Sequence, residues 1–312
     1  MRLIFCGTPG FAVPTLCALL AAGHNVELVL TQPDRTSGRG LALQHSAIKQ
    51  VALEHNLPSA QPEKLRNNPV LQQQLKAIAA DAIIVVAYGR IIPPWMLALP
   101  RYGNLNLHGS LLPKYRGAAP VQWAIACGET EIGVTTMHLD EGLDTGDILL
   151  QRHITIGGEQ TATELMPMLA DIGAALMVET LVALEKGTLP VTPQNASLAT
   201  LAPMLQREDG HMYCSRTAVE IYNRWRGFQP WPGAFGILRE KKFTVHCMRL
   251  LAESVRPALP SGTLLQVGGR LLLACGSATW LELEEVQMEG KKRMPAIDFL
   301  RGFALTPGER LA

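Results

Sequence analysis

The sequence has few charged residues, no very long hydrophobic run and no paired cysteines. Charged side chains make up 18% and apolar side chains 47% of the 312 residues, which is typical of a soluble globular protein. No window approaches the ~20 apolar residues of a membrane-spanning helix, so we expect no membrane partner. Met1-Arg2 leads straight into an apolar run that is too brief for a signal peptide. A cytoplasmic location is therefore expected.

The six cysteines are scattered, and none has the paired spacing of a metal site. Several lie within apolar strand or helix patterns, which indicates reduced core residues of a cytoplasmic protein. We therefore expect no metal. The length of the chain is large for a single core and comfortable for two domains.

Strand-like and helix-like segments alternate through the first half of the chain. Residues 3–6, 26–30, 82–87 and 104–107 are apolar runs of strand length, and helical patterns follow several of them. This alternation predicts an α/β domain over residues 1–187, with a doubly wound, Rossmann-like and mostly parallel sheet.

The alternation stops between residues 188 and 205, where three prolines lie among small polar residues. We interpret this segment as a linker. Beyond it, Thr217 begins a capping-box helix, and short apolar runs follow that are separated by Gly, Pro and Ser. About five short strands with glycine corners predict that residues 206–312 form a small β-barrel of the oligonucleotide-binding type.

The most informative stretch is residues 106–113, Asn-Leu-His-Gly-Ser-Leu-Leu-Pro. Side chains two apart on a strand share a face, so Asn106 and His108 should project together. An amide donor and an imidazole at a strand end can stabilise oxyanion charge and move a proton. Asp144 could orient the imidazole and favour its charged form. Taken alone, however, a strand-end histidine is more often structural, and Asp-Xaa-Gly pieces are usually turns.

The whole string resembles the formyltransferase family that uses 10-formyltetrahydrofolate. His-Gly-Ser-Leu-Leu-Pro, the Asn before it and Gly-Leu-Asp-Thr-Gly all match without gap or substitution. The resemblance implies that Asn106, His108 and Asp144 are the catalytic residues and that the formyl donor is a co-substrate. It further implies folate contacts for Ser110, Leu111, Leu112, Pro113, Val86 and Tyr88. Packing alone would also explain the valine.

Within this family, the chain is most similar to the members that formylate the α-amine of initiator methionyl-tRNA. Residues 31–41 resemble the insertion by which those members reach the acceptor end of the tRNA, where Arg35 and Arg39 can pair with phosphates. Relatives often carry two lysines where this chain has Leu41 and Ala42. The resemblance implies an enzyme of translation initiation that works as a monomer.

The second half of the chain is the more basic one. Residues 204–312 carry 15 Lys/Arg and 11 Asp/Glu, whereas residues 1–203 carry 13 and 16. A possible tRNA-backbone patch consists of Lys241, Lys242, Lys291, Lys292 and Arg293. Solvated turns would explain the same lysines. Residues 210–214 depart from the family, since relatives usually show Arg/Lys-Ile-Asp-Trp where this chain has Gly-His-Met-Tyr-Cys.

Three other functions remain open at this point. A sugar-nucleotide or other small-amine formyltransferase would share the catalytic trio, and so would a formyltetrahydrofolate hydrolase. The insertion at residues 31–41 and the basic second half disfavour both. A non-catalytic tRNA-binding protein is disfavoured because the trio is intact.

Overall fold

The computed structural model describes residues 1–37, 42–251 and 259–312, which divide into two units. Unit 1 comprises Met1–Pro120, Glu131–Ile156 and Glu164–Pro203, and unit 2 comprises Val121–Thr130, Gly157–Thr163 and Met204–Ala312. The sequence had assigned the first two segments of unit 2 to the first domain. They pack with unit 2 through side chains that lie far away in sequence.

An aromatic pair and two hydrogen bonds join these segments to the rest of unit 2. The ring of Trp123 meets Phe228 edge-on at 5.2 Å between centroids. Arg226 donates hydrogen bonds from Nη1 to the carbonyls of Gly157 and Gln160. Such contacts between distant residues leave no mark on local sequence periodicity.

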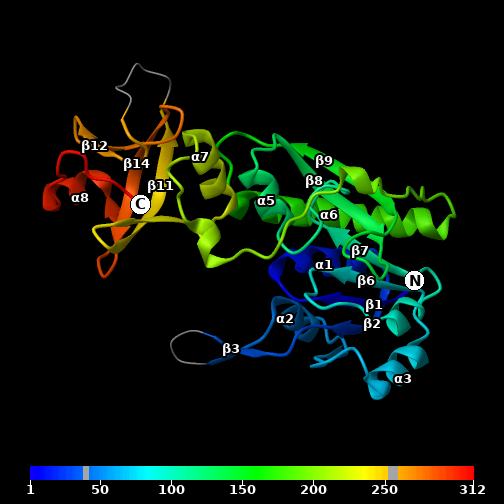
Figure 1. Cartoon of the computed structure of the whole chain (residues 1–312). Coiled ribbons are helices and arrows are strands. Elements are labelled where there is room, and N and C mark those ends of the chain that lie inside the picture. The colour runs from blue at the N-terminus through cyan, green and yellow to red at the C-terminus, as the bar shows by residue number, and fades with distance from the viewer. Residues whose placement is uncertain (38–41, 252–258) are drawn as a thin grey trace. The chain divides into compact units, whose positions relative to one another are not determined.

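Unit 1 is built on a seven-stranded sheet in the order β5-β2-β1-β6-β7-β8-β9 (Figure 1). Its parallel strands are β1 (Arg2–Gly7), β2 (Asn25–Leu30), β5 (Ser59–Ala60), β6 (Ala82–Val86) and β7 (Asn104–His108). This arrangement confirms the predicted Rossmann-like class. Two antiparallel strands, β8 (Glu131–His138) and β9 (Ile148–Thr155), extend the sheet and were not predicted.

The helices of unit 1 begin at signals that the sequence carries. The Ser46 side chain caps α2 (Ala47–Glu54) by accepting from the Lys49 N–H. The remaining helices of this unit are η1 (Gly10–Ala12), α1 (Val13–Ala21), α3 (Pro69–Ile78), α4 (Pro94–Leu97), α6 (Ala162–Glu185) and η2 (Ala196–Leu198). Helix α5 (Pro120–Ala126) begins at the predicted proline and lies almost entirely in unit 2.

Helix α6 corrects the expectation that no segment of the chain approaches the length and hydrophobicity of a membrane-spanning helix. In the described part of the chain it is long and apolar enough to cross a membrane by length and composition. Half of its most apolar stretch is buried inside the protein, and Gly173 lets Leu107 of β7 approach its backbone closely. These contacts fit a core helix.

Unit 2 contains an antiparallel sheet in the order β10-β11-β14-β13-β12, with β15 paired to β14. Its strands are β10 (Ala234–Leu238), β11 (Lys241–Leu250), β12 (Leu264–Val267), β13 (Arg270–Ala274), β14 (Trp280–Met288) and β15 (Met294–Pro295). The sheet confirms the predicted small β domain and is consistent with a barrel-like arrangement.

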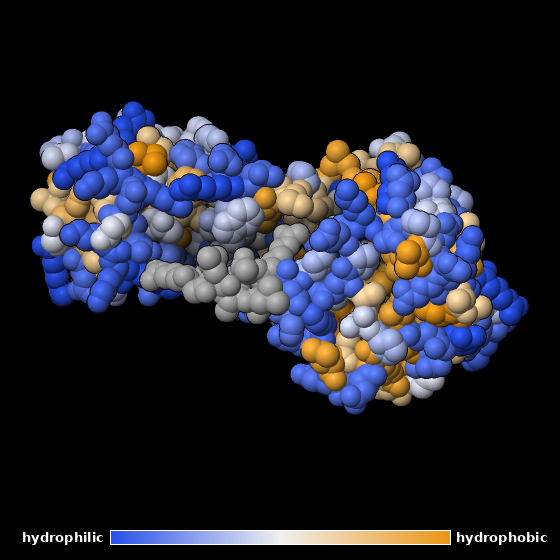
Figure 2. Space-filling model, turned by 90° about the horizontal axis from the view of Figure 1, so that it is seen from below, coloured by the Kyte–Doolittle hydropathy of each residue, from blue (hydrophilic) through white to orange (hydrophobic). Residues whose placement is uncertain are grey.

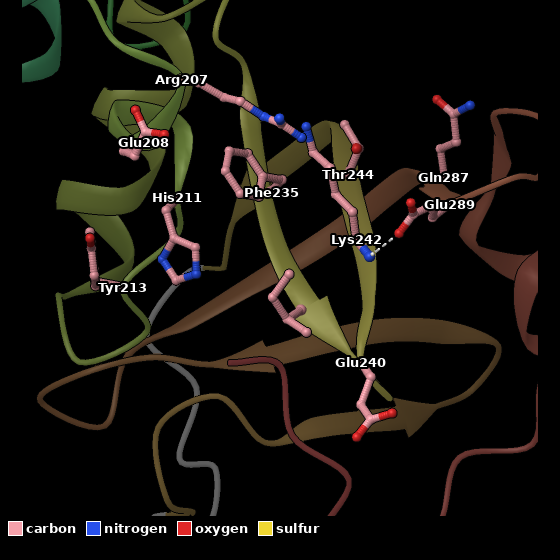
Figure 3. Close-up of a pocket in the computed structure, with 11 residues that line it drawn as sticks. Arg207, Glu208, His211, Tyr213, Phe235, Glu240, Lys242, Thr244, Gln287 and Glu289 are labelled. Carbon is pink, nitrogen blue, oxygen red and sulfur yellow. Dashed lines mark hydrogen bonds between the residues drawn. The ribbon is translucent and has the colours of Figure 1, made fainter.

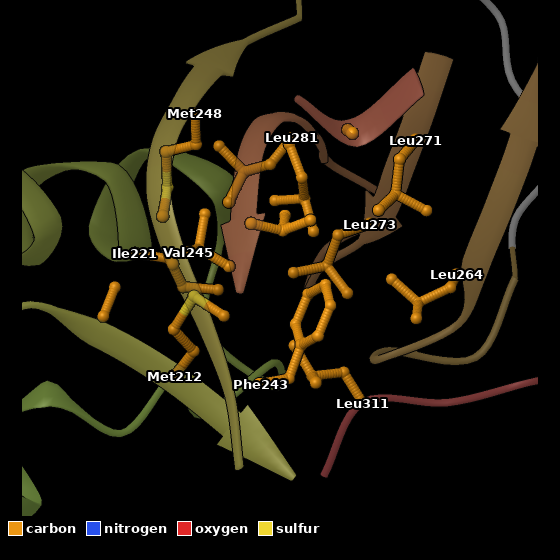
Figure 4. Close-up of a cluster of buried hydrophobic side chains, with 14 of the residues drawn as sticks. Met212, Ile221, Phe243, Val245, Met248, Leu264, Leu271, Leu273, Leu281 and Leu311 are labelled. Atoms are coloured by element: carbon orange, nitrogen blue, oxygen red, sulfur yellow. The ribbon is translucent and has the colours of Figure 1, made fainter. Parts of the chain in front are cut away.

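The core of unit 2 is filled by apolar side chains from most of these strands (Figure 4). Phe243, Leu271, Leu273 and Leu281 are all fully buried. The helices of this unit are η3 (Arg207–Gly210), α7 (Ala218–Gly227) and α8 (Ala296–Gly302), and α7 begins with the predicted capping box at Thr217.

Residues 188–203, interpreted as part of a linker, are hydrogen-bonded to unit 1. Thr192 forms a bridge with Ile148, and Leu201 forms a bridge with Arg116. The division into a catalytic domain, a linker and a tRNA-binding domain at residues 187 and 205 stays a proposal.

On the face seen in Figure 2, hydrophobic surface is broken into small areas among hydrophilic residues.

An ion-pair cluster in the sheet of unit 2, in which a buried Glu282 is paired with two partly exposed arginines, predicts acid sensitivity. Hydrogen bonds from Arg270 and then Arg249 hold the pKa of Glu282 at about 2, below its usual 4.5. A lowered carboxyl pKa contributes stability that is present above the usual value and lost as the pH falls towards the folded value. Glu282→Gln should therefore lower the melting temperature at neutral pH and flatten its fall between pH 4.5 and about 2.

Thermal melts across that pH range measure this effect. Asp171→Asn, at an exposed position of α6, is the control and should leave the profile unchanged. A Glu282→Gln profile parallel to that of the unaltered protein would show that the cluster does not set the acid limb.

Candidate active site

Strand β7 brings Asn106 and His108 to one face of the sheet. The strand is buried along its whole length, because β6 and β8 flank it and side chains cover both faces. Asn106 is 8% exposed and His108 is 5% exposed. Leu107, between them, points to the opposite face against Gly173. The alternation along the strand is therefore the one that the sequence predicts.

His108 is held between two acceptors. Its Nε2 lies 2.9 Å from the carbonyl oxygen of Tyr115, close enough to donate a hydrogen bond. Its Nδ1 lies 3.7 Å from Oδ2 of Asp144, a charge pair that is longer than a normal hydrogen bond. The ring is thus held on the Tyr115 carbonyl through Nε2, while Nδ1 faces the Asp144 carboxylate.

Asp144 is itself fixed by a turn that only glycine can form. The N–H of Gly117 donates to Oδ2 of Asp144 at 2.8 Å. Gly117 has a φ of 124°, and a Cβ on it would lie 2.6 Å from the carbonyl oxygen of Ala202. The glycine at position 117 therefore helps to fix the position of Asp144.

Gln194 completes the support of Asp144 and was missed by sequence reasoning. Its Nε2 donates to the carbonyls of Asp144 and Gly146 at 2.9 and 2.7 Å. Arg116 in turn donates from Nε and Nη2 to Oε1 of Gln194. Asp144 has a φ of 51°, an uncommon conformation that these bonds help to hold. A lone glutamine in a proline-rich polar segment carries no sequence signal of such a role.

The Asn106 side-chain amide makes no hydrogen bond to the described part of the chain. The residue keeps some exposure to solvent, so the amide is open to an added partner. It is therefore available as a hydrogen-bond donor on the same face of β7 as His108. The arrangement can stabilise negative charge on a carbonyl oxygen and move a proton.

The loop predicted to contact folate is tied down by Thr135 and Gln151. The Thr135 hydroxyl donates to the Ser110 carbonyl at 2.6 Å and accepts from the Leu112 N–H. Gln151 donates to the Leu112 carbonyl. The Leu112 side chain is buried, at 4% exposure, while its neighbours Leu111 and Pro113 are partly exposed. These two are the loop side chains open to a ligand.

Val86 and Tyr88, both predicted to contact folate, lie at and just beyond the end of β6. Their side chains are fully buried, at 0% and 1% exposure, and burial raises the pKa of the Tyr88 hydroxyl. The Tyr88 carbonyl accepts from Thr8 and Gln32. Ala87 between them is exposed and has a φ of 46°. The folate contacts of Val86 and Tyr88 stay a prediction.

Residues 31–41, predicted to be an insertion that contacts the tRNA, include one strand of a two-stranded ribbon. Strand β3 (Arg35–Ser37) pairs with β4 (Ala42–Gln44). Arg39 and Leu41 lie outside the described residues. The base of the ribbon is anchored at Asp34, whose pKa is lowered to about 2, first by the hydrogen bond from Lys49.

The five cations of the predicted tRNA patch do not have equal surroundings. Lys241, Lys291 and Lys292 are exposed. The Lys242 ammonium lies 4.2 Å from the centroid of the Phe235 ring. Arg293 is paired with Glu285. The described parts of the chain show no cluster of His, Cys, Asp or Glu able to hold a metal.

Comparison with known proteins gives two family matches and several long relatives. Residues 1–181 match the formyl transferase model, and residues 204–304 match the model of the formyl transferase C-terminal domain. A methionyl-tRNA formyltransferase of Acidobacterium capsulatum is 63% identical over 311 residues, covering 100% of this chain and 99% of that protein. The same enzyme of Koribacter versatilis is 55% identical, with 100% and 98% covered.

Solved structures support the fold. WlaRD, a sugar 3N-formyl transferase crystallised with dTDP and 5-N-formyl-THF, gives a TM-score of 0.66 at 19% identity, covering 94% of this chain and 99% of that one. HypX from Aquifex aeolicus in complex with tetrahydrofolic acid gives 0.61 at 18% identity, with 96% and 47% covered.

Proposed function

This chain belongs to the formyl transferase family and, within it, to the methionyl-tRNA formyltransferases, and from that membership we propose how its residues act. The enzyme moves a formyl group from a formyl-tetrahydrofolate to methionyl-tRNA, which yields formylmethionyl-tRNA for translation initiation. We propose 10-formyltetrahydrofolate as the donor, the initiator tRNA as the carrier and the cytoplasm as the location. The free Asn106 amide beside the His108–Asp144 pair is the observation that carries the proposal.

The reaction forms one C–N bond and breaks another. The α-amine of methionine, with a reference pKa of about 7.7–8.0, has a sizeable neutral fraction near neutral pH. It attacks the formyl carbon, and negative charge develops on the formyl oxygen. The bond to N10 of the folate then breaks, N10 takes up a proton, and the amine loses one. When bound, the folate supplies only the activated formyl group.

Asn106 and His108 stabilise the negative charge that develops on the formyl oxygen. The Asn106 amide and the protonated His108 ring donate to the formyl oxygen, a contribution of about 2.7–4 kcal/mol per donor in other enzymes. The Nε2–H of His108 is held on the Tyr115 carbonyl, so Nδ1 is the nitrogen left for the reaction. Asp144 balances the charge of the imidazolium. As the amine loses its proton, Nδ1 passes its own proton to Asp144 and takes up the amine proton, directly or through a water.

The residues around the trio fit a folate. Leu111 and Pro113 offer partly exposed apolar surface, and the fixed backbone of the loop keeps that surface in place. Ser110 and Leu112 stabilise the loop itself. The Ser110 hydroxyl donates to the Lys114 carbonyl, and the Leu112 side chain is buried. We assign direct contact to the first pair and support to the second.

Formyl transfer to charged initiator tRNA tests the function. Purified protein is given 10-formyltetrahydrofolate with methionyl-tRNA, with a free amino sugar, or with no amine. Formyl-methionine on the tRNA is the expected product. Formyl transfer only to the sugar would assign the enzyme to the small-amine class, and equal formate release without an amine would make it a hydrolase.

Gln194 is a positioning residue in this scheme, and its loss should slow the reaction. Gln194→Ala frees the backbone around Asp144, and misplacement of a group by 1 Å can cost about 100-fold. We expect kcat to fall ~10- to 100-fold with little change in the KM for tRNA. The acid limb of the kcat profile should also move, because Asp144 would no longer face His108 at a fixed distance.

Leu198→Ala is the matched control in the same segment, since this side chain is 59% exposed. It should leave kcat and the pH profile unchanged. Gln194→Glu keeps the size of the side chain but presents acceptors to two carbonyls, so it should not rescue activity. Full activity of Gln194→Glu would refute the positioning role.

A further inference from the structure

Unit 2 contains a pocket of about 620 Å³ that the catalytic scheme does not use (Figure 3). Its walls come from η3, the turn at residues 211–213, and strands β10, β11 and β14. The turn is where the sequence departs from its relatives, with His211 and Tyr213 in place of the usual residues. All residues of the pocket lie within unit 2.

One wall of the pocket is aromatic. The rings of His211 and Tyr213 are 4.7 Å apart between centroids, and His211 meets Phe235 edge-on at 5.5 Å. Tyr213 is 51% exposed, which is unusual for a large ring in a packed cluster. Nδ1 of His211 is buried and has no hydrogen-bond partner in the described chain. The exposed Tyr213 ring suits stacking against a planar base.

Two cations converge on the same space. Figure 3 shows the Arg207 side chain reaching from η3 towards Thr244, on the side of the pocket that Lys242 lines. Burial first, and then the charge of Arg207, lowers the pKa of Lys242. Each cation thus disfavours the other, and an anion between them would relieve this cost.

The acidic residues of the pocket offset these cations only in part: the charge of Glu289 raises the pKa of Lys242, but burial and the charge of Arg207 outweigh it. Glu289 accepts a hydrogen bond from the backbone N–H of Lys242 at 3.0 Å. Glu208 and Glu240 project away from the space between Arg207 and Lys242 in Figure 3. The pocket also adjoins the predicted tRNA patch, because Gln287 on its wall donates to the Lys291 carbonyl and Lys241 neighbours Lys242.

We propose that this pocket receives a single unpaired nucleotide of the tRNA, with its base against His211 and Tyr213 and its phosphate between Arg207 and Lys242. The assignment rests on the proposed function, since it names a contact of the same tRNA substrate. It adds base stacking to a surface otherwise expected to contact only the phosphate backbone. Base–aromatic stacking tolerates any base, so the pocket would read an unpaired state more than a sequence.

The test compares binding of a short single-stranded oligoribonucleotide with that of a duplex of the same length, using the full chain at fixed salt. Tyr213→Ala should weaken single-strand binding ~5- to 100-fold, the range expected for one stacked base, and duplex binding by less than ~2-fold. Tyr213→Phe, which keeps the ring, should bind as the unaltered protein does. Arg207→Gln should weaken single-strand binding and reduce its dependence on salt.

Arg301→Gln on α8 is the matched charge control, because this exposed cation lies outside the pocket. It should leave single-strand binding unchanged. Equal losses of single-strand and duplex affinity, or no loss of either, would overturn the proposal. AMP is a second probe of the pocket. The proposal would also fail if the protein binds AMP but Tyr213→Ala leaves the affinity for tRNA unchanged. Formyl transfer by the unaltered protein is measured alongside. If the unaltered protein transfers formyl but Tyr213→Ala binds RNA normally, the proposed function stands and the nucleotide pocket is refuted.

Discussion

His108→Ala should lower kcat by about 1,000-fold or more while folate binding survives. The imidazole is placed to donate to the formyl oxygen and to relay the amine proton. Loss of one oxyanion donor costs about 100- to 1,000-fold in other enzymes, and loss of a general acid or base costs about 100- to 10,000-fold. These interactions belong mainly to the transition state, so the loss should fall on kcat rather than on the KM of either substrate.

The pairing of His108 with Asp144 predicts non-additive losses. If Asp144 acts only through the imidazole, its removal has little left to remove once His108 is gone. His108→Ala with Asp144→Ala should therefore cost little more than His108→Ala alone. Asn106→Ala should lower kcat by itself, because its amide donates to the same formyl oxygen as His108.

Steady-state kinetics of the single and double variants measure this, with tetrahydrofolate binding and thermal melts as checks on folding. His153→Ala on β9 is the matched control, since this histidine belongs to the same sheet and its side chain is 52% exposed. It should retain full activity. Fully additive losses for His108→Ala and Asp144→Ala would separate the two residues, and the 3.7 Å pair would then have no catalytic meaning.

The sequence predicted the elements whose signals are local. Strands β1, β2, β6 and β7 were visible because buried parallel strands read as continuous apolar runs. Ser46 and Thr217 marked helix starts through side chains that cap the next turn. Strands β8 and β9 carry no such signal, because polar residues such as Thr135 and Gln151 interrupt their apolar runs.

The depth of the predicted folate contacts could not be read from the sequence. The resemblance marks Leu112, Val86 and Tyr88 as neighbours of the cofactor, but all three side chains pack into the core. Membership of a motif says that a segment borders a site. Which of its side chains face the ligand depends on the backbone turn, here on residues such as Ala87 with a φ of 46°. The same holds for Gln194, whose role exists only through contacts 50 residues away in the chain.

Neutralising Lys291, Lys292 and Arg293 together should raise the KM for methionyl-tRNA ~10- to 100-fold at low salt and flatten its salt dependence. Each cation that neutralises a phosphate releases counterions, so loss of three such contacts should lower the salt slope by about 2–3. The rate at saturating tRNA should change much less, because these residues lie in unit 2 and the trio lies in unit 1.

The structure divides this effect unequally among the three residues. Arg293 is paired with Glu285, so its charge is partly neutralised before the tRNA arrives. Changing only Lys291 and Lys292 should therefore reproduce most of the triple effect, and Arg293→Gln alone should do little. The prediction also bears on Leu41 and Ala42, where relatives often carry lysines. Restoring Lys at both positions should tighten tRNA binding and partly compensate for the loss of the patch.

A matched triple variant decides whether position or mere charge matters. Changing Lys64, Lys76 and Lys186 to Gln removes the same charge from exposed positions of unit 1. A general electrostatic attraction would weaken equally in both triples, whereas a phosphate-contacting patch would weaken only in the first. If the Lys291–Lys292–Arg293 variant keeps its KM and salt slope, these residues are solvated surface charge. The tRNA must then reach the trio along another path.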